Sequence, residues 1–258
     1  MIKLSANLGF LWQSLSLPDA VRAAHAAGFQ AVECHFPYEV PVDDVLSALN
    51  ETGLTMLGLN TIRGNVDNGD NGLAALAGRE DEARQAIDEA IAYATAINCQ
   101  NIHVMAGFAD PASSEAQKVF TNNLRYACKA AAKANKTILI EPLNQYDAPG
   151  YHLPTLQDAL AVLDRVGEPN IKIMYDCYHM QIMGGDLLRR YRSVADHVGH
   201  IQFASVPDRA EPDSGEVNFV WLLNELKAAG YEGAFGAEYK PRSSTDEGLG
   251  WMAQYASK

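Results

Sequence analysis

Ile138-Leu139-Ile140-Glu141-Pro142, near the middle of the chain, is the stretch that decides the fold, because it places one carboxylate directly after an apolar run. A short apolar run that is closed by a proline is typical of a strand buried on both faces of a parallel sheet. An ionised carboxyl group at the end of such a strand is costly unless a cation, a proton or a ligand meets it. Glu141 is therefore a candidate functional residue.

Three later segments repeat this pattern of an apolar run that ends on a polar side chain. Asp176 closes the run 171–176, Gln202 lies near the end of the run 200–203, and Glu238 follows the run 234–237. The carboxyl ends of parallel strands meet at one edge of a sheet. We therefore expect these three side chains to converge with Glu141.

Strand-like and helix-like segments alternate along the whole chain. Several helical segments, recognised by the spacing of small and apolar residues, end at a glycine such as Gly28, Gly53 or Gly230. Such alternation predicts a parallel sheet with helical crossovers. Eight units in 258 residues, roughly 32 residues each, match one (β/α)8 TIM barrel, so we predict a single domain spanning 1–258. A doubly wound open sheet is the alternative, but no glycine-rich nucleotide-binding turn follows the first strand.

The composition limits the classes of partner. The chain has 20 Lys and Arg against 32 Asp and Glu, a net charge of −12, which disfavours nucleic acid because phosphate contacts need cationic side chains. The four cysteines are scattered without C-x-x-C spacing, which favours a reducing compartment over a zinc-finger-type site. We see neither a secretory signal nor an apolar run of the roughly 20 residues that a membrane span needs. The sequence therefore predicts a cytoplasmic protein with no membrane partner.

The four strand-end residues form a set of potential ligands that are all oxygens. These are Glu141, Asp176, Gln202 and Glu238. Such a set suits Mg²⁺ or Mn²⁺ better than zinc or copper, and a divalent cation would offset the cost of gathering three carboxylates in one cavity. Any one carboxylate could instead form a salt bridge with a nearby loop. The presence of all four at successive strand ends favours the metal site.

Three further side chains are candidates for contact with a substrate. His179 falls three residues past the end of the run 171–176, where a substrate contact is favoured over a purely structural role. Arg209 lies in the polar loop after the run 200–203, and a solvated surface position is its alternative. Lys240 would point to the same face as Glu238 by the alternation of side chains along a strand, either as an anion contact or as a counter-charge.

Taken together, these segments resemble the hydroxypyruvate isomerase family, which includes 2-oxo-tetronate isomerases and belongs to the xylose-isomerase-like TIM barrels. The resemblance covers nearly the whole chain and is carried by E-P-L-N (141–144), Y-D-C-Y-H-M-Q (175–181), H-I-Q (200–202), G-E-V-N (215–218) and E-Y-K-P (238–241). Members usually have P-G-R-E where this chain has A-G-R-E at 77–80, a departure that concerns the shape of a loop rather than the chemistry.

The resemblance implies that the four strand-end residues ligate the metal and that two of them, Glu141 and Glu238, are also the acid/base pair. It implies that His179 and Arg209 hold oxygens of the substrate. In such an enzyme the cation stabilises the enediolate formed when a proton leaves the carbon beside the ketone of a hydroxy-oxo acid. A carboxyl group returns a proton to the adjacent carbon. From hydroxypyruvate the product would be tartronate semialdehyde.

Other functions stay open at this point. 2-Oxo-tetronate is the alternative substrate, and ketose 3-epimerisation is a further alternative. Phosphodiester cleavage, as in the apurinic-site endonucleases of this barrel, needs a histidine-rich multi-zinc site and a basic face that this acidic sequence lacks. A non-enzymatic sugar-acid-binding protein would not need both Glu141 and Glu238. The physiological acid, the metal, the order in which the two glutamates act and a homo-oligomeric state are all left open.

Overall fold

The computed structural model describes residues 1–255, whose contacts divide the chain into two compact units. The first unit comprises Met1–Leu57 together with the chain from Tyr175 onward, and the second comprises Gly58–Met174. The single domain spanning 1–258 stays a prediction. Across residues 1–255, the helices are too short or too polar to serve as a membrane span.

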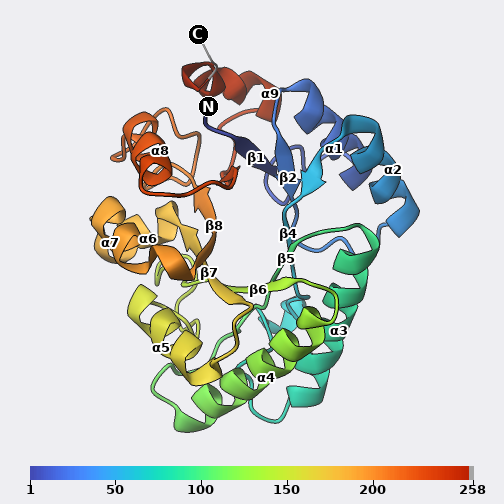
Figure 1. The fold of residues 1–258 in the computed structure, drawn as a ribbon, viewed down its shortest axis with the longest axis vertical. Coiled ribbons are helices and arrows are strands. Elements are labelled where there is room, and N and C mark those ends of the chain that lie inside the picture. Colours follow the sequence, from blue (N-terminus) through green and yellow to red (C-terminus); the bar gives the residue numbers. More distant parts are fainter. Residues whose placement is uncertain (256–258) are drawn as a thin grey trace. The chain divides into compact units, whose positions relative to one another are not determined.

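In the first unit, parallel strands alternate with helices along the sequence (Figure 1). The strands pair in the order β3-β2-β1-β9-β8 and are β1 (Leu4–Asn7), β2 (Ala31–Glu33), β3 (Thr55–Met56), β8 (Val198–Phe203) and β9 (Phe235–Ala237). The helices are α1 (Leu17–Ala26), α2 (Val42–Thr52), α6 (Cys177–Gly184), α7 (Leu187–Val194), α8 (Phe219–Ala228) and α9 (Thr245–Gly248), with 3-10 turns η2 (Ala195–His197) and η3 (Leu249–Gln254).

The second unit follows the same pattern (Figure 1). Its strands pair in parallel in the order β4-β5-β6-β7 and are β4 (Gly58–Asn60), β5 (Asn101–His103), β6 (Thr137–Ile140) and β7 (Ile171–Asp176), the last two residues of β7 belonging to the first unit. The helices are α3 (Glu80–Ala96), α4 (Ser114–Ala132) and α5 (Leu156–Val166), with the 3-10 turn η1 (Val66–Asn68). Helices α3 and α4 lie side by side.

The apolar run Ile138–Ile140 forms a strand, as its sequence predicts. Strand β6 is fully buried at Ile138, Leu139 and Ile140, and it ends directly before Glu141. The glycine stop signals also hold, since α2 ends at Gly53, whose φ of 70° is in the left-handed region that glycine adopts without strain.

The segment 55–60 does not form one continuous strand, because it is interrupted at Leu57. The N–H of Leu57 donates to the carbonyl oxygen of Val32 in β2 at 2.7 Å, whereas Gly58–Asn60 pairs with β5. The segment changes its hydrogen-bonding partner at this point, so two short strands, β3 and β4, take the place of one.

Candidate active site

Arg209 joins two of the predicted carboxylates in the first unit. Its Nη2 lies 2.6 Å from Oε2 of Glu238 and 3.5 Å from Oδ2 of Asp176. The guanidinium carbon lies over the rings of Phe10 and Tyr178, 5.0 and 4.9 Å from their centroids. Arg209 is therefore packed into the acidic cluster and is only 14% exposed, so the alternative of a solvated surface position does not describe it.

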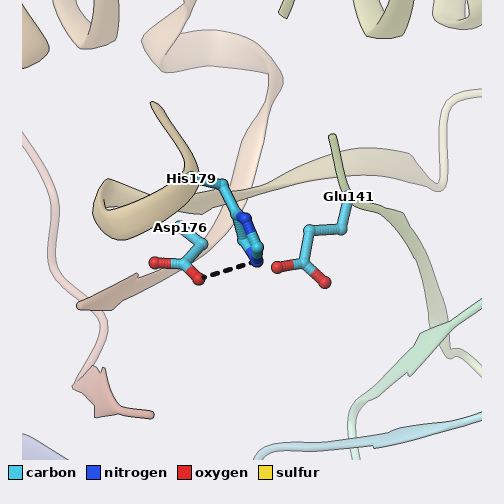
Figure 2. A group of neighbouring side chains, drawn as sticks. All are labelled: Glu141, Asp176 and His179. Carbon is cyan, nitrogen blue, oxygen red and sulfur yellow. Dashed lines mark ion pairs between the residues drawn. The ribbon is translucent and has the colours of Figure 1, made fainter. Parts of the chain in front are cut away.

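Asp176 ends β7 and also caps the N-terminus of α6. One carboxylate oxygen, Oδ1, accepts a hydrogen bond from the N–H of Tyr178 at 2.8 Å, and the other, Oδ2, lies 3.5 Å from Nε2 of His179. Figure 2 shows this ion pair as a dashed line. Both side chains are buried, so the strand end and the first turn of the helix together hold a carboxylate and an imidazole away from water.

Glu238 follows β9 directly and is held from two further sides. Its Oε1 accepts a hydrogen bond from Nδ2 of Asn7 at 2.9 Å and lies 3.0 Å from Nε2 of His35. His35 can take this position because residue 9 is a glycine, and an added Cβ at Gly9 would overlap the imidazole ring. The carboxylate therefore has polar partners on both oxygens.

The two carboxylates of this cluster have very different proton affinities. Burial raises the pKa of Asp176 from 3.8 to about 7, although Arg209 acts in the opposite direction. Burial also acts to raise the pKa of Glu238, but Arg209 and His35 outweigh it and lower that pKa from 4.5 to about 2. The closer approach of the guanidinium to Glu238 explains the contrast. Glu238 is thus ionised at neutral pH and can accept a proton.

Two buried oxygens of the first unit fit a cation. Gln202, in β8, donates from Nε2 to Oε1 of Glu33 at 3.2 Å, while its own Oε1 accepts no hydrogen bond within residues 1–255. Oδ2 of Asp176 likewise accepts no hydrogen bond within these residues. Buried polar atoms are normally satisfied, and oxygens of carboxylate and amide groups are the ligands that Mg²⁺ and Mn²⁺ prefer.

Glu141 lies in the second unit, directly after β6, and its side chain is buried. Its Oε2 lies 3.6 Å from Nδ1 of His103, the last residue of β5. Figure 2 draws the Glu141 carboxylate as well. Glu141, Asp176 and His179 each offer a ligand atom of a kind that metal ions accept.

Lys240 is the predicted site residue that the structure leaves in solvent. Because β9 ends at Ala237, the alternation of side chains along a strand does not extend to residue 240. The main-chain N–H of Lys240 donates to the carbonyl oxygen of Arg209 at 2.7 Å. Its side chain is exposed and lines a cavity of about 470 Å³, together with Phe10 and Trp12.

Four further side chains belong to these groups of contacts but are not among the candidates that the sequence identifies. They are Asn7, Glu33, His35 and His103. Asn7, Glu33 and His103 are the last residues of their strands, and His35 lies two residues past one. The strand-end signal that identifies Glu141 could therefore have found them.

Comparison with known proteins identifies the family. A family model described as "Xylose isomerase-like TIM barrel" matches residues 21–255. The chain belongs to this family. The (β/α)8 barrel that the alternation of strands and helices predicts is thereby confirmed.

Relatives within this family cover the chain from end to end. The 2-oxo-tetronate isomerase of Cupriavidus necator is 41% identical over 260 residues, which cover 100% of both chains. The hydroxypyruvate isomerase of Escherichia coli is 37% identical over 258 residues, which cover 99% of this chain and 100% of that one. A crystal structure described as an AP endonuclease of family 2 from Brucella melitensis aligns with a TM-score of 0.95 at 38% identity, covering 100% of both chains. The predicted resemblance and the isomerase class are confirmed by the two isomerases.

Proposed function

We propose that this isomerase uses a divalent cation to convert hydroxypyruvate into tartronate semialdehyde through an enediolate. One observation carries the proposal. Two buried oxygens, Oδ2 of Asp176 and Oε1 of Gln202, accept no hydrogen bond within residues 1–255 in the cluster that also contains the ionised Glu238. An isomerisation by proton transfer needs a cation to stabilise negative charge and a carboxylate to accept the proton, and this cluster offers a place for both.

The proposed ligand set contains the four residues at strand ends: Glu141, Asp176, Gln202 and Glu238. In the barrels of this fold, the carboxyl ends of the strands form the active-site face, which supports assigning Glu141 of the second unit to the same set. Mg²⁺ or Mn²⁺ would, when bound, supply the positive charge that stabilises the two enediolate oxygens.

Proton transfer is assigned to the two glutamates. Glu238, which is ionised at neutral pH, accepts the proton as the C3–H bond of hydroxypyruvate breaks and its electron pair forms the C2=C3 double bond. Glu141, which takes a proton from solvent, delivers it to C2, while the hydroxyl proton moves from the C3 oxygen to the C2 oxygen. Glu238 then releases its proton to solvent. The atoms balance, since the product is an isomer of the substrate.

Three cationic or titratable side chains are proposed to hold the substrate. Arg209 can face a planar carboxylate with a bidentate pair of N–H groups, and His179 is buried beside Asp176 in the same cluster. Lys240, exposed at the cavity, can attract the anionic substrate before it binds.

Deuterium exchange tests the assignment of Glu238. With Mg²⁺ in D₂O, the wild-type protein should convert hydroxypyruvate into tartronate semialdehyde that carries solvent deuterium at C2, as read by ¹H NMR. Glu238→Gln should lower this rate by roughly 10²–10⁴-fold, the usual contribution of a general base. Glu225→Gln, at a partly exposed surface ion pair with Arg192, is the matched control and should keep the wild-type rate. Absence of both product and deuterium with the wild-type protein would refute the proposal.

A second candidate substrate is 2-oxo-tetronate, favoured by the relative from Cupriavidus necator that carries this activity in its name. Both acids present a ketone beside a hydroxylated carbon and a carboxylate, so the same residues would serve either. Measuring kcat/KM for hydroxypyruvate and for both enantiomers of 2-oxo-tetronate side by side decides between them. We also propose a cytoplasmic location. The four cysteines support it, because they are buried and form no disulfide within residues 1–255.

A further inference from the structure

Glu33 is the centre of a buried chain of hydrogen bonds in the first unit. Its Oε2 lies 2.5 Å from Nε2 of His200, and its Oε1 accepts hydrogen bonds from Nε2 of Gln202 at 3.2 Å and Nδ2 of Asn7 at 3.3 Å. Nδ1 of His200 lies 3.3 Å from the hydroxyl of Tyr231, which holds the ring from its other side. Both oxygens of Glu33 therefore have polar partners, as expected for a residue that is only 3% exposed.

The contact with Glu33 decides which way the amide of Gln202 points. A carboxylate only accepts hydrogen bonds, so the NH₂ of Gln202 must face Glu33 and its oxygen must face away. That oxygen, Oε1, is buried and accepts no hydrogen bond within residues 1–255. Glu33 therefore presents the amide oxygen, rather than the amide nitrogen, as a potential ligand.

Asn7 links Glu33 to a second proposed ligand. The N–H of Gly9 donates to Oδ1 of Asn7 at 2.9 Å, which leaves the NH₂ of Asn7 facing the two glutamates. Nδ2 donates to Oε1 of Glu238 at 2.9 Å and to Oε1 of Glu33 at 3.3 Å. Asn7 and Glu33 are partners in the β1–β2 register, so the sheet itself sets this spacing.

The side chain of Glu33 fits into the sheet because residue 236 is a glycine. Gly236 pairs with Gln202 between β9 and β8. A Cβ added at Gly236 would overlap Oε1 of Glu33 and would lie 2.9 Å from both Cγ of Gln202 and Nε2 of His200. A side chain at this position would displace the chain of hydrogen bonds, so the backbone is fitted to it.

We propose that Glu33 is a positioning residue of the metal site, which fixes Gln202 directly and Glu238 through Asn7. The inference rests on the metal site proposed above. Glu33 itself contacts neither the metal nor the substrate in this scheme. It selects the amide oxygen of Gln202 and limits the positions open to the carboxylate of Glu238. Partners of this kind orient metal ligands in many enzymes.

Mn²⁺ binding in the absence of substrate tests the proposal without relying on activity. The electron paramagnetic resonance signal of free Mn²⁺ gives the dissociation constant for wild type and for Glu33→Gln. The amide that this substitution introduces at position 33 can donate as well as accept, so the Gln202 amide is free to turn its nitrogen toward the metal. We expect Glu33→Gln to raise the Mn²⁺ dissociation constant by about 10–100-fold. In the isomerase assay, kcat should fall while KM changes less.

A change at a second buried carboxylate separates positioning from general loss of structure. Glu211→Gln is the matched control, because Glu211 is another buried carboxylate, paired with Arg242, and its loss should lower stability but leave Mn²⁺ binding unchanged.

The outcomes are distinct. Wild-type protein that binds no Mn²⁺ overturns the metal site and this inference with it. If the wild-type protein and Glu33→Gln bind Mn²⁺ equally tightly, the role of Glu33 is overturned and the metal site is not. If Glu33→Gln does not fold, Gly236→Ala takes its place. The added methyl group must shift Glu33 and also meets Cγ of Gln202, while the four proposed ligands keep their residue types. Unchanged Mn²⁺ binding by that variant would equally contradict the role of Glu33.

Discussion

Replacing Arg209 by methionine should strongly destabilise the metal-free protein. Methionine keeps part of the apolar volume against Phe10 and Tyr178 but removes the cation that faces Glu238 and Asp176. Two buried carboxylates are then left without their guanidinium. Removing one partner of a buried ion pair costs about 3–5 kcal/mol, because the remaining charge stays out of water without compensation.

The lowered pKa of Glu238 gives a second, independent value for this loss of folding free energy. Its lowering from 4.5 to about 2, against the opposing effect of burial, corresponds to about 3 kcal/mol of folding free energy at neutral pH. A carboxylate with a lowered pKa contributes stability above the pKa of the unfolded chain and loses it as the pH falls. The difference in unfolding free energy between wild type and Arg209→Met should therefore have its full value at pH 7 and should shrink below about pH 4.5.

Urea unfolding in the presence of EDTA, at pH 7 and at a series of lower pH values, measures this difference. Arg192→Met is the control, because Arg192 lies 3.4 Å from Glu225 in an exposed pair that should contribute no more than about 1 kcal/mol. A loss of less than about 1 kcal/mol for Arg209→Met at pH 7, or an equal loss at pH 3 and at pH 7, would refute this role of the Arg209 ion pairs.

Two further predictions concern the second unit. Burial lowers the pKa of His152 below 6.5, so the folded ring stays neutral while the unfolded chain takes up a proton. Stability should therefore fall as the pH drops through 6.5. In His152→Gln, the thermal unfolding midpoint should change less between pH 7 and pH 5 than it does in the wild type. Gly72→Ala should cost at least about 2 kcal/mol in urea unfolding, because φ is +115° and the added Cβ would lie 2.7 Å from the N atom of Gly107. Gly69→Ala, with φ of +88° and open space around the added Cβ, should cost only about 1 kcal/mol; equal losses at both glycines would show that the close approach is unimportant.

The strand ends could be predicted from the sequence because their signal is local. An apolar run followed by a breaker fixes where β6 ends and hence where Glu141 lies, without any knowledge of neighbouring strands. The place of Arg209 could not be predicted in this way. It lies in an irregular loop with φ of +53°, and only the folded loop brings its guanidinium to Glu238, 29 residues later in the sequence.

The role of each strand-end carboxylate could not be predicted from the sequence either, for a different reason. Glu33 and Asp176 end their strands in the same way, so the local pattern cannot tell a residue that orients a ligand from one that is a ligand. The folded partners separate them. Glu33 lies 2.5 Å from an imidazole nitrogen and Glu238 lies 2.6 Å from a guanidinium nitrogen, but the nearest nitrogens of His179 and Arg209 are each 3.5 Å from Oδ2 of Asp176. Asp176 is accordingly the least compensated of the three carboxylates, and its pKa is raised where that of Glu238 is lowered. A divalent cation would therefore gain most in this unit beside Asp176, which is the physical reason for centring the proposed metal site on the end of β7.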